Sequence, residues 1–305
     1  MKNIDQLNLK FGTNRDISFR ELPGNIIIID INNCLASASV SLYGGHVVSW
    51  QPKTQTKPVL WLSDMVKFQQ GKAIRGGVPI CWPWFGAHKS QASLPGHGYA
   101  RITAWVLTSV QTLNNGATRL ELSLGKSHLF YAHWYANVRL TLRVTLGDTL
   151  EMTLKTLNES EHEFTFTEGL HTYFQVSDIA NVRILGLEGC EYIDSLNQNE
   201  RCTQEAAISF NDQLGRIYLN SQAACVIEDP KFQRRIRIVK SGSNSTAVWN
   251  PGQIVAGTIN DMGPSSWRNM VCVESANALQ NAVKLLPGFP HEHNAFYSVE
   301  NFYQT

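Results

Sequence analysis

The sequence carries little charge, and that charge is almost evenly balanced. Charged residues fill 17% of the 305 positions, with 26 Lys and Arg against 25 Asp and Glu, whereas an average globular chain has about 25%. A chain this close to neutral lacks the broad positive field that holds nucleic acid, so nucleic acid is excluded as the main partner. Hydrophobic residues at 43% and aromatic residues at 10% exclude a disordered chain.

Long apolar runs and paired cysteines are missing as well. The longest purely aliphatic run is Ile26–Ile29, while a membrane-spanning helix needs about 20 apolar residues. Met1–Phe11 has no apolar core and is therefore not predicted to be a signal peptide. None of the six cysteines forms a C-x-x-C pair, and Cys81 and Cys272 sit among apolar neighbours. We expect reduced thiols, a cytoplasmic protein and no membrane partner.

Helical periodicity is scarce, and alternation with a period of two takes its place. Leu35–Leu42 reads LASASVSL, and Val138–Leu157 holds two alternating runs hinged at Gly147 and Asp148, which predicts a β-hairpin. Further strands are predicted at Leu120–Leu124, Phe164–Val176, Val182–Ile193, Arg216–Leu219, Ala224–Glu228, Arg235–Val239, Met270–Glu274, Ala282–Leu286 and Ala295–Glu300.

A helical turn or two is predicted only at Asp64–Gln70 and Gly263–Asn269. Many strands without long helices predict an all-β protein built as a large antiparallel β-sandwich. No repeat, low-complexity linker or shift in composition marks a boundary. We therefore expect residues 1–305 to form a single domain.

One segment, Phe68–Arg101, breaks the strand rhythm. It reads FQQGKAIRGGVPICWPWFGAHKSQASLPGHGYAR. A connection this long is usually functional or disordered, and its Trp, Phe and Cys residues argue against disorder. Glycines beside Arg75 and His97 suit a backbone that closely approaches a ligand. Trp84 and its aromatic neighbours suit the wall of a sugar pocket, because aromatic rings stack on the C–H faces of sugars.

The same segment carries motifs that resemble a known family. RGGVP starts at Arg75, WPWFG at Trp82 and HGYAR at His97, and EGLHTYF follows downstream at Glu168. Further matching pieces stand in the same order at Gly44–His46, Trp249–Gly252, Val273–Glu274 and Leu286–Gly288. Together they resemble the aldose 1-epimerase (galactose mutarotase-like) superfamily, and more closely its hexose-6-phosphate branch, the glucose-6-phosphate 1-epimerases.

The resemblance implies a galactose mutarotase-like supersandwich and an isomerase that interconverts the α and β anomers of a hexose 6-phosphate. In this reaction a base takes the proton of the anomeric hydroxyl, an acid protonates the ring oxygen, and the ring opens and closes again on the other face. The reaction needs no cofactor, and we expect no metal. The expected partner is a small molecule, a hexose phosphate, and we expect the protein to be a monomer. One carboxylate and one imidazole are needed, which we expect about a sugar ring apart.

The resemblance assigns the acid to His171 and the base to Glu274. From the residues alone, His171 could equally be a structural histidine in a buried strand, and Glu274 a solvated carboxylate at a strand end. The two apolar residues before Glu274 favour a position where desolvation raises its pKa, as a general base requires.

Arg75 and Arg101 are the predicted phosphate ligands, because guanidinium groups match phosphate oxygens in pairs. The alternative is two surface arginines paired with acids. Lys72 and Lys89 are weaker candidates, with solvated side chains as the default. His97 is expected to bind a sugar hydroxyl or the phosphate unless it is a structural turn residue, and Gln69 is a further binding candidate.

One position departs from the family pattern. Relatives often carry an Asp before Arg-Ile-Tyr, where this chain has Gly215, and the nearest acid is Asp212. Either Asp212 replaces that contact through a shifted loop, or the contact is absent. Two alternatives therefore stay open: a catalytically silent sugar-phosphate-binding module of the same fold, and an aldose 1-epimerase for a non-phosphorylated sugar.

Two other patterns favour no site. His291 and His293 would share one face of a strand and could chelate a metal, but they follow the turn Leu286–Gly288 and no third ligand is evident. The basic run Lys231–Arg237 alternates like a strand with one solvated face.

Overall fold

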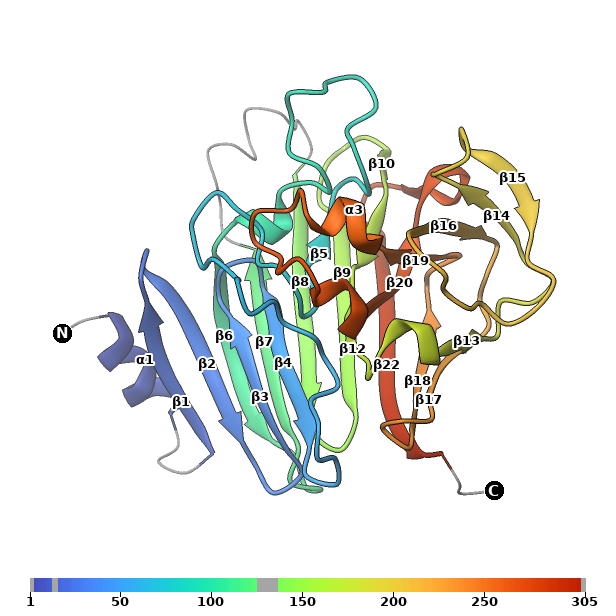
Figure 1. Ribbon diagram of the computed structural model, residues 1–305. Helices are drawn as coiled ribbons and strands as arrows, with labels where there is room; N and C mark the ends of the chain where they lie inside the picture. Colours follow the sequence, from blue (N-terminus) through green and yellow to red (C-terminus); the bar gives the residue numbers. More distant parts are fainter. Residues whose placement is uncertain (1–2, 13–15, 125–136, 303–305) are drawn as a thin grey trace.

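The computed structural model describes residues 3–12, 16–124 and 137–302, and it shows the predicted mostly β, antiparallel architecture (Figure 1). In this described part the strands form four sheets. The four-stranded sheet has the order β1 (Ile17–Leu22), β2 (Ile26–Asn32), β3 (Ala36–Ser41) and β4 (His46–Pro52). A two-stranded sheet pairs β10 (Phe164–Phe166) with β21 (Val283–Leu285).

Two eight-stranded sheets complete the fold. The first runs in the order β15 (Glu200–Thr203), β14 (Glu191–Asp194), β16 (Leu214–Leu219), β19 (Ser245–Asn250), β20 (Met270–Asn277), β11 (Glu168–Leu170) and β5 (Ile80–Cys81), with β12 (Tyr173–Gln175) also pairing with β20. The second runs in the order β13 (Arg183–Leu185), β17 (Cys225–Asp229), β18 (Arg234–Ser241), β22 (Pro290–Asn301), β9 (Leu150–Asn158), β8 (Val138–Leu146), β7 (Thr118–Leu124) and β6 (Trp105–Thr112).

Helices are few and short in the described residues. They are α1 (Asn3–Phe11), α3 (Gly252–Ala256) and the 3₁₀ turns Ala100–Ile102, Ile179–Asn181, Ser266–Asn269 and Leu279–Asn281. None of these described helices has the length and apolar character needed to cross a lipid bilayer. The helical turn predicted near Gly263–Asn269 is confirmed as the 3₁₀ turn, whereas Asp64–Gln70 forms a loop with no helix.

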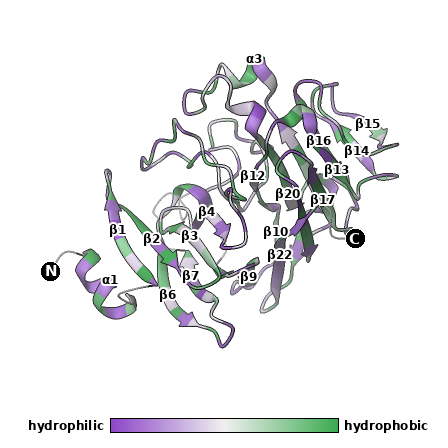
Figure 2. Cartoon of the chain, turned by 60° about the horizontal axis from the view of Figure 1, so that its bottom comes forward, coloured by the Kyte–Doolittle hydropathy of each residue, from purple (hydrophilic) through white to green (hydrophobic). Residues whose placement is uncertain are grey.

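The alternation of apolar residues predicted the strands well. β8 and β9 form the expected hairpin, with Leu146 paired to Leu150 across the turn at Gly147 and Asp148. Every second residue of β9 is buried, and Figure 2 shows hydrophilic and hydrophobic residues alternating along several strands. The six cysteines are free thiols, as expected.

Two predicted strands are wrong as continuous elements. Phe164–Val176 is divided into β10, β11 and β12, because β10 pairs with β21 while the other two pair with β20. Val182–Ile193 is divided into β13 and β14, with Gly186 in a left-handed conformation (φ 93°) between them. Period-two alternation continues through such breaks, so it does not reveal a change of partner strand.

A large cluster of buried hydrophobic residues packs between the sheets. Its members come from strands along the described chain, the first being Ile17 and the last Tyr297. Trp50 of β4 donates its Nε1 hydrogen to the carbonyl oxygen of Gly147 (2.9 Å), which ties the four-stranded sheet to the β8–β9 hairpin. Strand β22 belongs to the same eight-stranded sheet as β8 and β9, and it packs against β20 of the first eight-stranded sheet. The first eight-stranded sheet is thereby left with one face against β22 and the other facing outward.

Candidate active site

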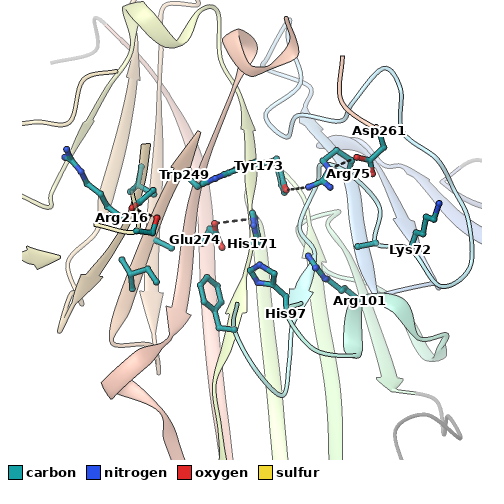
Figure 3. A pocket seen from close by; sticks show the side chains of 17 residues that line it. Lys72, Arg75, His97, Arg101, His171, Tyr173, Arg216, Trp249, Asp261 and Glu274 are labelled. Atoms are coloured by element: carbon teal, nitrogen blue, oxygen red, sulfur yellow. Dashed lines mark hydrogen bonds and ion pairs between the residues drawn. The ribbon is translucent and has the colours of Figure 1, made fainter. Parts of the chain in front are cut away.

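A cavity of about 550 Å³ opens on the outward face of the sheet that contains β20 (Figure 3). Five of the predicted site residues line it together: Arg75, His97, Arg101, His171 and Glu274. The long segment Phe68–Arg101 contributes the two arginines and His97 to the cavity lining. Within it the described structure contains only the two-residue β5 and the start of one 3₁₀ turn.

His171 and Glu274 lie side by side at the floor of this cavity. His171 follows β11 directly, and the register of β11 with β20 pairs Leu170 with Ser275, which brings His171 next to Glu274. Their Nδ1 and Oε1 atoms are 3.4 Å apart, with side chains 10% and 2% exposed. The expected separation of about a sugar ring is therefore wrong.

Burial shifts the pKa values of these two groups in opposite directions. Desolvation raises the pKa of Glu274 well above its ordinary value, although Arg101 partly opposes the shift. Desolvation lowers the pKa of His171, and the neighbouring His97, Arg101 and Arg75 lower it further. The pair therefore holds one proton between its two members over a wide range of pH.

Aromatic rings surround the imidazole of His171. Tyr173 stacks on it with ring centroids 4.9 Å apart, and His97 meets it edge-on at 5.3 Å. Nδ1 of His97 accepts a hydrogen bond from the amide of Gly86 and contacts the Cys81 sulfur. Burial lowers the pKa of His97 to about 3, with Arg101 and Arg75 adding to the effect. His97 is therefore a neutral imidazole, and among the described residues no hydrogen bond engages its other nitrogen, Nε2.

The two predicted phosphate ligands differ in how much of their charge is already engaged. Arg75 donates to Asp261 (3.1 Å) and to the Tyr173 hydroxyl (3.2 Å). Arg101 donates to the carbonyl oxygen of Gly96 (2.7 Å). Within the part of the chain that the structure describes, no carboxylate lies within ion-pair distance of Arg101 or Lys72, which also lines the cavity. An anion would therefore meet more uncompensated charge at Arg101 and Lys72 than at Arg75.

Three predicted binding residues do not line this cavity, and neither does the weaker candidate Lys89, which lines the neighbouring cavity. Gln69 is exposed on the loop before Lys72. Trp84 donates its Nε1 hydrogen to Pro95 (2.9 Å) and lines a neighbouring cavity of about 510 Å³. Asp212 is exposed and lies beside Gly252, so it does not replace the missing family acid. Sequence spacing could not locate these side chains, since loops determine their direction.

Gly215 does line the cavity, and a side chain there would require the Ser195 side chain to move. A Cβ atom at this position would lie 2.4 Å from the Ser195 hydroxyl oxygen, which donates a hydrogen bond to the Gly215 carbonyl (2.8 Å). Sequence reasoning missed Asp261, Tyr173 and Trp249 as cavity residues. Asp261 sits in a loop with no distinguishing pattern, whereas Tyr173 was within the quoted EGLHTYF motif.

One group of side chains has the composition of a metal site. Ligand atoms of His171, Cys272 and Glu274 lie within 4.8 Å of one another. A cysteine binds metal as thiolate, and burial raises the pKa of Cys272 well above its ordinary value. The thiol form is a poor ligand, so we assign no metal to these residues.

His291 and His293 lie on β22, not in a loop, and both face a buried carboxylate. His291 Nε2 is 2.8 Å and His293 Nδ1 is 3.4 Å from Glu168 Oε1. Burial alone would raise the pKa of Glu168, but His293 and His291 lower it to about 2. This pairing accounts for both histidines without a metal.

We expect Glu168→Gln to destabilise the fold by on the order of 3 kcal/mol at pH 7. The folded pKa of Glu168 lies below its unfolded value, so the carboxylate stabilises the fold above about pH 5 and loses this effect as the pH falls toward 2. Urea unfolding of both proteins at pH 7 and pH 3 measures the difference. Equal stability of the two at pH 7, or a difference that grows on acidification, would contradict the pairing.

Comparisons with known proteins agree with the fold. The family model described as aldose 1-epimerase matches residues 28–298. A protein of Salmonella typhimurium named "Putative glucose-6-phosphate 1-epimerase" is 37% identical over 274 residues, covering 89% of this chain and 90% of the relative. One of the same name from Cenchrus ciliaris is 34% identical, covering 86% and 80%. The crystal structure of "a putative mutarotase (YeaD)" from Salmonella typhimurium aligns with TM-score 0.87 at 33% identity, covering 94% of each chain.

Proposed function

This chain belongs to the aldose 1-epimerase family, and on that premise we propose that it is a glucose-6-phosphate 1-epimerase, interconverting the α and β anomers of a hexose 6-phosphate. The observation that carries the proposal is the contact between Glu274 and His171 on the floor of a cavity. The anomeric oxygen and the ring oxygen are bonded to the same carbon. An acid and a base that are in contact with each other can therefore reach both oxygens of one bound sugar.

In the proposed reaction Glu274 removes the proton of the anomeric hydroxyl while His171 protonates the ring oxygen, and the C1–O5 bond breaks. Rotation about C1–C2 turns the aldehyde over. The ring then closes as O5 attacks C1. In this step Glu274 returns its proton to the carbonyl oxygen, and the O5 hydroxyl gives its proton back to His171. Each cycle restores both residues, so no cofactor takes part in the proposed reaction.

The electrostatics of the cavity determine where the shared proton of the pair lies. Ring opening leaves a protonated Glu274 and a neutral His171. This is the arrangement that burial favours, because desolvation raises the pKa of Glu274 and lowers that of His171. Burial favours the same proton positions before the reaction, so the proton must pass from Glu274 to His171 across their 3.4 Å contact before Glu274 can act as the base.

The positive groups of the cavity divide between phosphate and sugar. We assign the phosphate to Arg101 and Lys72, which form no ion pair with a carboxylate of the described residues. Arg75 is paired with Asp261 and Tyr173, and this polar group suits sugar hydroxyls, which need both donors and acceptors. His97 offers Nε2 to a further hydroxyl.

Magnetisation exchange between anomer signals by NMR tests the function directly. We expect the protein to accelerate exchange of glucose 6-phosphate well above the buffer rate, and to act more slowly on free glucose and galactose. Equal rates on free and phosphorylated sugars would favour an aldose 1-epimerase for non-phosphorylated sugars. Binding of the phosphate without faster exchange would favour a silent binding module.

The pH profile of kcat/KM should be bell-shaped, with a plateau where the pair carries one proton. A second proton would have to bind His171, whose pKa is lowered by burial, so the acidic limb should lie below the usual range of a histidine. The last proton would leave Glu274, whose pKa is raised, so the alkaline limb should lie well above the usual range of a carboxyl group. An acidic limb at the usual histidine pKa would contradict this description.

A further inference from the structure

The two proposed catalytic residues have a polar support behind them, in the interface between the two large sheets. His293 of β22 contacts the Ser275 hydroxyl of β20 through Nε2 (3.0 Å). Tyr297 of the same strand contacts the Thr172 hydroxyl (2.8 Å). All four residues are at most 1% exposed. Such contacts are costly to leave unmade in a core, so they fix the interface at two points.

The position of these contacts in the chain relates them to the active site. Ser275 directly follows Glu274 and Thr172 directly follows His171. Neighbouring residues of β20 point to opposite faces, so Glu274 faces the cavity and the Ser275 hydroxyl faces β22. At the turn between β11 and β12, His171 lines the cavity while the Thr172 hydroxyl contacts β22. His293 and Tyr297 are four residues apart and lie on one face of their strand. One strand thus holds the backbone beneath both members of the pair.

The arrangement of Ser275, His293 and Glu168 resembles a catalytic triad, in which a serine, a histidine and a carboxylate contact one another in that order. His293 places Nε2 near the serine and Nδ1 3.4 Å from the carboxylate. A nucleophile must reach its substrate, but Ser275 is 1% exposed and does not line the cavity of the proposed site. The arrangement therefore fits mechanical support and not covalent chemistry.

We propose that His293 and Tyr297 are positioning residues for anomer exchange, acting through Ser275 and Thr172 to hold Glu274 and His171 in contact. The inference rests on the proposed function and adds residues to it that touch no substrate. A displacement of about 1 Å in a reacting group can cost about 10²-fold in rate. Loss of one support should therefore lower kcat measurably without removing a reacting group.

The test uses Tyr297→Phe and Ser275→Ala, each of which removes one hydroxyl oxygen. Thr118→Val is the matched control, because it removes a buried hydroxyl that accepts from Asn33 (3.0 Å) on β7, away from the cavity. We expect kcat for glucose 6-phosphate to fall about 10-fold to 100-fold in the first two variants. KM should change less than about twofold, because the substrate-contacting groups stay in place. Unchanged kcat in both variants, or equal losses in the control, would overturn the proposal.

A second measurement does not depend on turnover. The imidazole NMR signals of His171, assigned with a His171→Gln variant, should shift and titrate differently in Tyr297→Phe but not in Thr118→Val. If the wild-type protein proves not to be an epimerase, this comparison still decides whether β22 positions the pair. Identical His171 signals in all three proteins would overturn the positioning role, as would labelling of Ser275 by a fluorophosphonate.

Discussion

Glu274→Gln should lower kcat for anomer exchange of glucose 6-phosphate about 10²-fold to 10⁴-fold, the usual contribution of one general base. The amide keeps the size and shape of the carboxyl group but cannot accept the proton of the anomeric hydroxyl. Glu274 is 2% exposed, and the amide adds neither charge nor bulk at this buried position, so the fold should tolerate the substitution. NMR magnetisation exchange measures the rate, and thermal unfolding checks the fold.

A matched control separates loss of the base from loss of a buried carboxylate. Glu228 is 5% exposed on β17 and pairs with Arg183 and Arg235 in the other large sheet. Glu228→Gln should lower stability and leave kcat unchanged. A variant at Glu274 that keeps full activity, or one that loses activity only in proportion to its stability, would remove Glu274 as the base.

His171→Ala should cause a loss of similar size, and the double variant should be little worse than either single one. The two residues exchange protons with the same substrate in one cycle, so removing one member leaves the other without its partner. Additive losses in the double variant would instead indicate two independent contributions.

The strands of this protein could be predicted from alternation because one face of most strands is buried. β8 and β9 show this clearly, since both residue pattern and turn were present in the sequence. The strand breaks in Phe164–Val176 could not be predicted, because partner choice depends on distant strands such as β20 and β21. Alternation records burial and contains no information on which strand lies alongside.

The candidate site divides in a similar way. Motif resemblance located His171, Glu274, Arg75, Arg101 and His97, and the structure places all five around one cavity. The prediction that Trp84 lines the same cavity is wrong. Its indole donates a hydrogen bond to the carbonyl oxygen of Pro95 and lines a neighbouring cavity. The motifs also did not indicate Asp261, which accepts a hydrogen bond from Arg75 although the two residues are 186 positions apart in the sequence. Contacts made by loops across such distances depend on tertiary structure and have no local signal.

Arg75 and Arg101 were equivalent in sequence, and their surroundings now predict different behaviour. Arg101→Met should raise KM for glucose 6-phosphate by roughly 10-fold to 100-fold, because a hydrogen bond to a charged group is worth about 1.5–3 kcal/mol. Free glucose, which has no phosphate, should change less than about threefold. Arg75→Met should impair both sugars, since it also releases Asp261 and Tyr173 beside His171.

The comparison must be made on the plateau of each pH profile. Arg101 lowers the pKa of His171 and of Glu274, so its removal should move both limbs of the profile to higher pH. A change measured at one pH would mix this effect with the loss of phosphate binding. A KM for free glucose that rises as much as that for glucose 6-phosphate, measured on the two plateaus, would show that Arg101 holds the sugar and not the phosphate. The anion would then have to be bound by Lys72 or Arg75, and the charge on Asp261 argues against the latter.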